Sequence, residues 1–213
     1  MSSTNRGSKR SPADNYGTPG WCVHRLLDEP PEVLKTVGKN WIEPCAGDGN
    51  IIKAVEDWHN IRGEKHPTFD AVELRKVCRK KIMKRPSYRT LYCPQDFLEW
   101  QPPKTRYDVC ITNPPFWCAQ PILEKCLSIS KVVILLLRLN YVGSEKRHEF
   151  MRSAMPNDTL VLPNRPAFSK NKQGKLGTDS IEYAWFVWDS AFPTPEGRIR
   201  MLDLTPLDQR RSK

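Results

Sequence analysis

Short apolar runs of strand length alternate along this chain with amphipathic stretches of helical length. Runs such as Tyr107–Thr112 and Lys131–Leu137 have the length of buried strands and are too short to span a membrane. Stretches such as Asn50–Asn60 and Gln120–Ser130 carry apolar residues at helical spacing. Because alternating strands and helices build a mostly parallel sheet with helices packed on it, the sequence predicts an α/β fold.

The pattern predicts seven strands, a further edge strand and helices between them. The strands are residues 39–44, 68–74, 88–93, 107–112, 131–137, 159–163 and 182–188, and the further edge strand is 198–204. The helices are a short one within 16–29, then 50–60 with Asn50 as its N-cap, 75–85, 120–130 and 144–155. Open parallel sheets bind ligands at the carboxyl ends of their strands, so the residues that follow each strand are the candidate site.

The chain has a basic excess and two polar ends. Its 34 Lys and Arg against 24 Asp and Glu give a formal charge of +10. This excess fits a polyanionic partner, nucleic acid first and an anionic membrane second, although a solvated basic surface is the simpler alternative. Residues 1–15 lack the apolar core of a signal peptide and are predicted to be a disordered basic tail. Residues 16–205 are predicted to form one domain without a separate target-recognition domain, followed by a polar C-terminal tail over 206–213.

Seven cysteines are present, and none of them forms a C-x-x-C pair. The four histidines are scattered and indicate no catalytic triad. The simplest interpretation is a reduced chain in the cytoplasm that binds no metal.

The segment Glu43–Asn50 (EPCAGDGN) joins the first strand to a helix through two glycines. Gly47 and Gly49 allow a positive φ or the close approach of a ligand. The loop contains Glu43 and Asp48 and lacks the Lys-Ser/Thr of a phosphate loop, so it favours a cationic, phosphate-free ligand such as a sulfonium with an amino-acid tail. An ordinary turn between strand and helix is the alternative.

Acidic residues end the next two strands. Glu73 stands 24 positions after Gly49, near the spacing at which a carboxylate binds ribose hydroxyls in dinucleotide folds. Asp96 can accept a hydrogen bond from the amine of a purine while Phe97 covers the ring. The simpler alternatives are a surface ion pair for Glu73, and a turn residue with a core aromatic for Asp96 and Phe97.

The fourth strand runs directly into Asn113-Pro114-Pro115-Phe116. Proline fixes its own φ and restricts the residue before it, so the carbonyls of Asn113 and Pro114 are held rigidly at the strand end. The Asn113 side-chain oxygen and the Pro114 carbonyl can accept both N–H bonds of one amino group, and Phe116 can stack on the ring that carries it. The motif predicts a site for an amino group on a planar ring, and a plain proline turn is the alternative.

In this order, the segments YGTP, EPCAGDGN, AVEL, QDF and ITNPPF resemble the motif series of S-adenosylmethionine-dependent amino methyltransferases, especially the DNA adenine-N6 type with Dam-like motif order. The resemblance covers about residues 16–116 by motif and reaches Trp188 by strand order. Residues 135–150 and 162–188 resemble the later part of small phage or prophage adenine methyltransferases. The resemblance implies a class I methyltransferase (Rossmann-like) fold, with a seven-stranded mostly parallel sheet, a C-terminal antiparallel hairpin and helices on both faces. It also implies S-adenosyl-L-methionine as cofactor, DNA as partner, and a bacterial or phage-infected host cytoplasm.

The resemblance further implies roles for individual residues. The methionine end of the cofactor would be contacted by Tyr16, Thr18 and Pro19, and its methionine and sulfonium would be cradled by Glu43, Pro44, Cys45, Ala46, Gly47, Asp48, Gly49 and Asn50. The ribose would be bound by Glu73, and the adenine by Asp96 and Phe97. The target base would be held by Asn113, Pro114, Pro115 and Phe116, and Asn113 would also border the cofactor.

Nucleic-acid contacts are predicted around Ser169–Asp179, a basic loop between the sixth and seventh strands. The residues expected to make them are Arg138, Asn140, Tyr141, Arg165, Phe168, Lys170, Lys172 and Lys175. A disordered hairpin tip is the alternative for this loop. Because strands and helices use nearly all of residues 16–204, recognition is expected to lie in short loops, to be weak, or to be supplied by a partner.

Two departures from the motif series keep the substrate open. Many DNA adenine enzymes have Asp where Asn113 stands and Tyr where Phe116 stands, whereas Asn and Phe occur elsewhere in the wider family. The leading prediction is methyl transfer to N6 of an adenine flipped out of DNA. The alternatives are an RNA methyltransferase acting on adenine N6 or guanine N2, a protein-glutamine methyltransferase, and an inactive methyltransferase fold that only binds nucleic acid.

Overall fold

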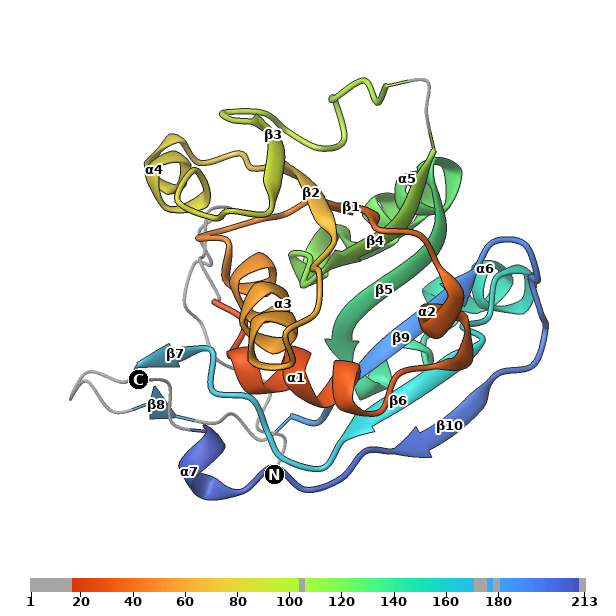
Figure 1. Ribbon diagram of the computed structural model, residues 1–213. Helices are drawn as coiled ribbons and strands as arrows, with labels where there is room; N and C mark the ends of the chain where they lie inside the picture. Colours follow the sequence, from red (N-terminus) through yellow and green to blue (C-terminus); the bar gives the residue numbers. More distant parts are fainter. Residues whose placement is uncertain (1–16, 104–105, 171–175, 178–180, 211–213) are drawn as a thin grey trace.

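The computed structural model describes residues 17–103, 106–170, 176–177 and 181–210 (Figure 1). Its main sheet contains, in chain order, β1 (Asn40–Glu43), β2 (Thr68–Val72), β3 (Tyr88–Tyr92), β4 (Tyr107–Thr112), β5 (Ser130–Arg138), β6 (Asp158–Leu162), β9 (Tyr183–Asp189) and β10 (Arg198–Met201). The spatial order is β10-β6-β9-β5-β4-β1-β2-β3. β9 runs antiparallel to both β5 and β6, and the other neighbouring pairs are parallel. The predicted mostly parallel sheet with an antiparallel C-terminal part is confirmed.

The remaining elements connect these strands. The α-helices are α1 (Gly20–Asp28), α2 (Glu32–Thr36), α3 (Asn50–Ile61), α4 (Arg79–Ile82), α5 (Ala119–Ile129), α6 (His148–Ser153) and α7 (Leu207–Arg210). Short 3-10 helices are η1 (Lys76–Cys78), η2 (Phe116–Cys118), η3 (Leu139–Tyr141) and η4 (Glu145–Arg147), and β7 (Ser169–Lys170) pairs with β8 (Leu176–Gly177) in a separate two-stranded sheet. None of these helices is long and apolar enough to cross a membrane.

Two hydrophobic clusters cover the two faces of the sheet. Successive side chains of a strand point to opposite faces, so Val132 and Ile134 of β5 pack with α1 and α3, whereas Val133 and Leu135 pack with α5. The fully buried Trp185 of β9 also donates a hydrogen bond from its Nε1 to the Cys22 carbonyl of α1, over 2.8 Å. Burial on both faces explains why the central strands read as continuous apolar runs. The predicted helices on both faces are confirmed.

The sheet has eight strands rather than the seven of the main prediction, because the predicted edge strand is present. It is shorter than residues 198–204: β10 ends at Met201 and pairs in parallel with β6, Arg198 beside Asp158. Arg198 and Asp158 also form an ion pair of 3.1 Å, which helps to hold the edge strand in place. The seven cysteines are all free thiols, and six of them are buried.

Two helix predictions need correction. The helix expected over residues 75–85 is limited to η1 and α4, because Arg75 stays extended to contact Glu73 and the basic run has no carboxylates at helical spacing. Asn50 is the first residue of α3 and not its cap. Gly49 takes the cap position with a φ of 75°, and no side chain in the described part of the chain caps the helix. Two short helices, α2 and α7, and the β7–β8 pair were not predicted; α7 lies in the segment expected to be a polar tail.

Candidate active site

A cavity of about 630 Å³ opens at the carboxyl ends of β1, β2 and β4, beside the segment that follows β3. Residues from the predicted site that line it are Thr18, Glu43, Pro44, Cys45, Ala46, Gly47, Asp48, Asn50, Glu73, Asp96, Phe97, Asn113, Pro114, Pro115 and Phe116. Parallel pairing aligns these strand ends, since Glu43 of β1 lies beside Ala71 of β2 and Ile42 beside Cys110 of β4. The motifs spread along a hundred residues of sequence therefore meet in one hollow.

The turn after β1 is shaped by backbone conformations that favour glycine. Gly47 has a φ of 55° and Gly49 a φ of 75°, both in the left-handed region. The turn is fixed by backbone hydrogen bonds, from Ala46 N–H to the Val72 carbonyl over 3.0 Å and from Gly49 N–H to the Ala46 carbonyl over 2.8 Å. The result is a rigid cradle whose backbone lines the cavity.

Glu73 ties this turn to the end of β2. Its Oε2 accepts a hydrogen bond from Gly47 N–H over 2.6 Å, and its Oε1 accepts from both N–H and Nε of Arg75, each over 2.8 Å. The side chain is 5% exposed. A carboxylate oxygen can accept more than one hydrogen bond, so these contacts orient Glu73 without using all of its acceptor capacity.

Glu43 is a buried carboxyl group without a full set of partners. It is 2% exposed, and its Oε2 has no hydrogen-bond partner among the described residues. Burial and then the nearby Glu73 carboxylate raise the pKa of Glu43 well above its ordinary value. A cationic ligand that binds beside an unpartnered buried acceptor supplies the interaction that the acceptor lacks. Such an acceptor at the wall of a cavity therefore favours the binding of a cation.

The neighbouring part of the cavity is apolar. Phe97 is buried against Trp100, with ring centroids 5.9 Å apart, and Leu74 and Leu98 reach the rim with 51% and 38% of their surface exposed. Asp96 accepts the Leu98 N–H through Oδ1 over 2.8 Å, which fixes the loop after β3. This arrangement suits a flat heteroaromatic ring with a polar edge, since apolar side chains cover its faces and a carboxylate meets its amine.

Asn113 faces the same cavity from the end of β4. Its Nδ2 donates a hydrogen bond to Oγ1 of Thr18 over 3.1 Å, and Thr18 is 6% exposed. The segment that carries Thr18 passes close over α3, because a Cβ on Gly17 would lie 2.5 Å from Nδ2 of Asn50. A side chain at position 17 would therefore require the Asn50 amide to move.

Phe116 is held by an aromatic and cationic cluster. Its ring lies 6.0 Å from that of Tyr183, which in turn makes an edge contact with Phe168 at 5.0 Å. The Arg138 guanidinium carbon stands 4.8 Å from the centre of the Phe116 ring, close enough for a cation–π interaction. Two residues predicted to contact nucleic acid, Arg138 and Phe168, thus support the wall of the cavity without lining it.

The other predicted residues lie in different surroundings. Pro19 caps the start of α1 and Gly49 the start of α3, and neither lines the cavity. Tyr141 is 7% exposed, Asn140 is exposed, and Arg165 forms an exposed ion pair of 2.5 Å with Glu182. Tyr16, Lys172, Lys175 and most of the loop Ser169–Asp179 lie outside the described residues, as does the side chain of Lys170.

Several lining residues escaped the sequence analysis. They are Gly17, Ile51, Leu74, Arg75, Gln95, Leu98, Trp117, Cys118 and Ile122. Gly17, Leu74 and Gln95 stand inside the quoted motif segments, and most of the others follow a motif within one or two positions, so adjacency was the available signal. Trp117 is the clearest example of this adjacency, because it directly follows the Asn113–Phe116 segment. In the structure it is 76% exposed.

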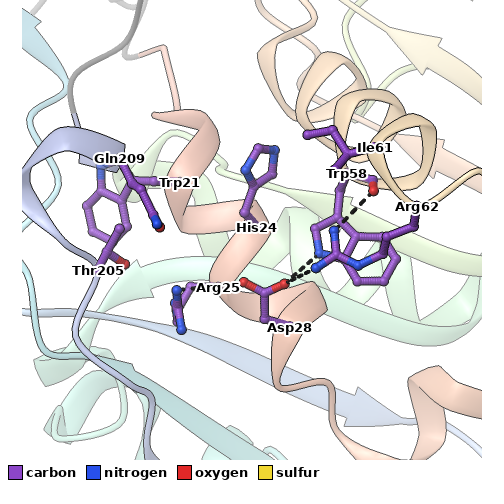
Figure 2. Close-up of a pocket in the computed structure, with 9 residues that line it drawn as sticks. All are labelled: Trp21, His24, Arg25, Asp28, Trp58, Ile61, Arg62, Thr205 and Gln209. Carbon is purple, nitrogen blue, oxygen red and sulfur yellow. Dashed lines mark hydrogen bonds and ion pairs between the residues drawn. The ribbon is translucent and has the colours of Figure 1, made fainter.

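A second hollow of about 400 Å³ lies between α1, α3 and the segment that leads into α7 (Figure 2). Three of its polar side chains are paired with one another: Asp28 Oδ1 accepts from Nε1 of Trp58 over 2.8 Å and from Arg62 over 2.7 Å. Arg25 Nε and Thr205 Oγ1 have no hydrogen-bond partner among the described residues. Arg62 also stacks over the Trp58 ring at 3.8 Å. Among the described residues predicted to bind cofactor or nucleic acid, none lines this hollow. The cavity at the strand ends is therefore the candidate site.

Comparison with known proteins supports the fold. No family model and no curated protein sequence matches the chain. Among solved structures, a Listeria monocytogenes protein assigned to the class I S-adenosylmethionine-dependent methyltransferases is similar, with a TM-score of 0.63, 16% identity, and coverage of 91% of this chain and 68% of that one. A Pyrococcus horikoshii protein assigned as an RNA methyltransferase has a TM-score of 0.60 and 17% identity, over 82% and 86% of the two chains.

A third similar structure is the methyltransferase subunit of a type I restriction-modification system from Streptococcus thermophilus. Its TM-score is 0.55 at 13% identity, and the match covers 86% of this chain but 46% of that subunit. With the strand order of the sheet, these likenesses establish the class I methyltransferase fold for this chain.

Proposed function

We propose that the protein is an S-adenosylmethionine-dependent methyltransferase that methylates the exocyclic N6 amino group of adenine in DNA. One observation carries the proposal: the acidic glycine turn and the Asn113–Phe116 segment line the same cavity. A methyl donor and an amino group held there would be neighbours. The similar solved structures, which act as or are assigned as methyltransferases, support the reaction class.

The residues of the cradle fit S-adenosylmethionine. Glu43 offers an unpartnered buried carboxyl oxygen to the cationic methionine end, and the backbone of Gly47 allows close approach. Glu73 has acceptor capacity for ribose hydroxyls, and Asp96 with Phe97 and Leu98 can hold the adenine. No phosphate-binding lysine occupies the turn, which agrees with a cofactor that has no phosphate.

The target side positions an amino group. When bound, the cofactor supplies an electrophilic methyl group on sulfur. The Asn113 Oδ1 and the Pro114 carbonyl accept the two N–H bonds of the adenine amine, which directs its lone pair toward that methyl group. The amino nitrogen held by these two acceptors would receive the methyl group from a bound cofactor, with S-adenosylhomocysteine as the leaving group, and would then lose a proton to water. Asn113 stays neutral throughout, so its contribution is positioning and stabilisation of charge.

The adenine must leave the duplex to reach this cavity, with Phe116 as its stacking partner. The wall behind Phe116 is stiffened by Tyr183 and Arg138, which keeps the ring in place for the incoming base. The formal charge of +10 supports binding to a polyanion but does not separate DNA from RNA. The preference for DNA rests on the resemblance in motif order.

The experiment that tests this proposal supplies tritiated S-adenosylmethionine with duplex DNA, structured RNA or a protein extract in parallel. Digestion of the labelled polymer to nucleosides identifies the modified atom, and N6-methyladenosine in the deoxy form is the expected product. A label found only in RNA nucleosides or in glutamine would reject the DNA assignment. Cofactor binding without transfer to any of the three would reject the enzymatic one.

A further inference from the structure

Trp117 stands apart from the other tryptophans of the chain. Five of the seven are at most 7% exposed and Trp58 is half-buried, whereas Trp117 is 76% exposed. It lines the mouth of the active-site cavity. An indole ring covers about 150–250 Å² when it is buried, so its exposure here leaves a large apolar surface open to water. Singly exposed apolar side chains are common on protein surfaces, so it is the place of Trp117 beside the cavity that indicates a contact.

The local backbone explains why this side chain points outward. Pro115 leads into the single turn of η2, which is closed by a hydrogen bond from Cys118 N–H to the Pro115 carbonyl over 3.1 Å. Phe116 and Cys118 pack into the hydrophobic clusters, and Trp117 between them faces away. Within the described part of the chain, its ring has no aromatic, cationic or hydrogen-bonded partner. Most of the indole surface is therefore available for contact.

The position of Trp117 indicates which ligand its side chain would contact. Cys118 and Ile122 line the interior of the cavity, whereas Trp117 lies at its outer edge, directly after the segment proposed to hold the target base. A nucleotide that leaves a base stack exposes one face of each neighbouring base. Aromatic side chains stack on such faces with little dependence on sequence. The cofactor, by contrast, is proposed to lie against Glu43, Glu73 and Asp96.

We propose that Trp117 stacks on the base that flanks the flipped adenine in the same strand and so holds the opened strand at the cavity mouth. This inference rests on the proposed function. Trp117 is a positioning residue here, since it touches the neighbour of the reacting nucleotide and not the reacting atoms. Its loss is expected to raise KM for the nucleic acid far more than it lowers kcat.

The test compares Trp117→Ala and Trp117→Phe with the wild type on an oligonucleotide that the wild type methylates. The loss of stacking on one base corresponds to a rise of about 5- to 100-fold in the KM of Trp117→Ala for the oligonucleotide. The kcat of this variant should change by less than about threefold. Trp117→Phe keeps an aromatic ring and should keep most of the activity. Phe192→Ala is the matched control, because Phe192 is 71% exposed but lies beyond the end of β9 and not at the cavity. It is expected to leave KM unchanged.

Two further measurements separate stacking from a structural effect. Oligonucleotides with an abasic site on the 5′ or the 3′ side of the target remove the proposed partner, and with one of them Trp117→Ala should be no worse than the wild type. Acrylamide quenching of tryptophan fluorescence should fall when oligonucleotide is added to the wild type, and this protection should be lost in Trp117→Phe.

The proposal is overturned if Trp117→Ala keeps the wild-type KM, or if its defect persists with both abasic oligonucleotides. It is also overturned if cofactor alone, and not oligonucleotide, protects the indole from acrylamide. Failure of the proposed function has a different signature, because the wild type then methylates no nucleic acid. In that event quenching with oligonucleotides still decides whether Trp117 contacts bases.

Discussion

Asn113 Nδ2 and Thr18 Oγ1 are joined by a hydrogen bond of 3.1 Å across 95 positions of sequence. This bond fixes the orientation of the Asn113 amide, because Nδ2 must face Thr18 in order to donate. The Oδ1 of Asn113 therefore points away from Thr18 and can accept a hydrogen bond. No described residue donates a hydrogen bond to that oxygen. Under the proposed function, Thr18 would orient Asn113 to accept an N–H from the substrate amine.

Replacing Thr18 by Val should slow methyl transfer, because the amide of Asn113 loses the partner that orients it. One hydrogen bond contributes about 0.5–1.5 kcal/mol, which corresponds to a fall of about 2- to 10-fold in kcat. Thr18→Ser keeps the hydroxyl group and is the matched control. Single-turnover rates at saturating cofactor measure the effect, and equal rates for Thr18→Val and Thr18→Ser would contradict the assignment.

Asn113→Ala should nearly abolish transfer, because one of the two acceptors for the amine is removed. Loss of one preorganised polar group of this kind lowers kcat by about 100- to 1,000-fold. The affinity for cofactor should change little, since the cradle around Glu43 and Glu73 is untouched. Initial rates and calorimetric binding measure the two quantities, and Asn60→Ala, an exposed change at the end of α3, is the control. An Asn113→Ala enzyme with normal turnover would remove Asn113 from the mechanism.

The sequence predicted the sheet well because strands buried on both faces appear in the sequence as short, continuous apolar runs. β4 and β5 are apolar on both faces, and turn residues or helices bound each of them, so their limits were found within one or two positions. The same reasoning predicted which residues would meet at one edge of the sheet. In parallel strands the carboxyl ends share one edge, so Glu43, Glu73 and Asn113 were expected to lie together, and all three line the same cavity.

Features that depend on tertiary contacts could not be predicted in this way. The helix expected over residues 75–85 is short because Arg75 turns back to bind Glu73, a contact that no local pattern encodes. The pairing of Thr18 with Asn113 joins segments that are distant in sequence. The exposure of Trp117 follows from the direction of a single helical turn after Pro115, whereas its sequence context reads as apolar.

Glu73→Gln should weaken both the fold and the binding of cofactor. The carboxylate receives the Gly47 N–H and two hydrogen bonds from Arg75, and an amide can accept on one side only. Hydrogen bonds to a charged group contribute about 1.5–3 kcal/mol, so the free energy of unfolding should fall by about that amount. Urea unfolding measures it.

Glu32→Gln is the matched control for this change. Glu32 also pairs with a cation, Lys35 at 2.6 Å, but its side chain is 74% exposed. Water and salt screen exposed ion pairs, so Glu32→Gln should have a small effect. Similar losses in the two variants would show that the Glu73 contacts do not hold the turn.

Glu43 should make the stability of the cofactor-free protein depend on pH. Burial and the Glu73 carboxylate raise the pKa of Glu43, so the folded state binds this proton more tightly than the unfolded state. Stability should therefore fall as the pH rises from the unfolded-state pKa of about 4.3 through the raised folded-state pKa, and then level off. Glu43→Gln should remove this part of the pH dependence, and thermal unfolding in a series of buffers measures it.

The same proton should be released when a cationic cofactor binds, because the positive charge favours the carboxylate form of Glu43. The affinity of the wild type for S-adenosylmethionine should then increase as the pH rises through the raised pKa. Glu43→Gln should bind more weakly above that pKa and without the increase. Titration calorimetry in two buffers of different ionisation enthalpy counts the released protons. A Glu43→Gln protein that releases as many protons as the wild type would assign the titration to another group and leave Glu43 without its role in the cradle.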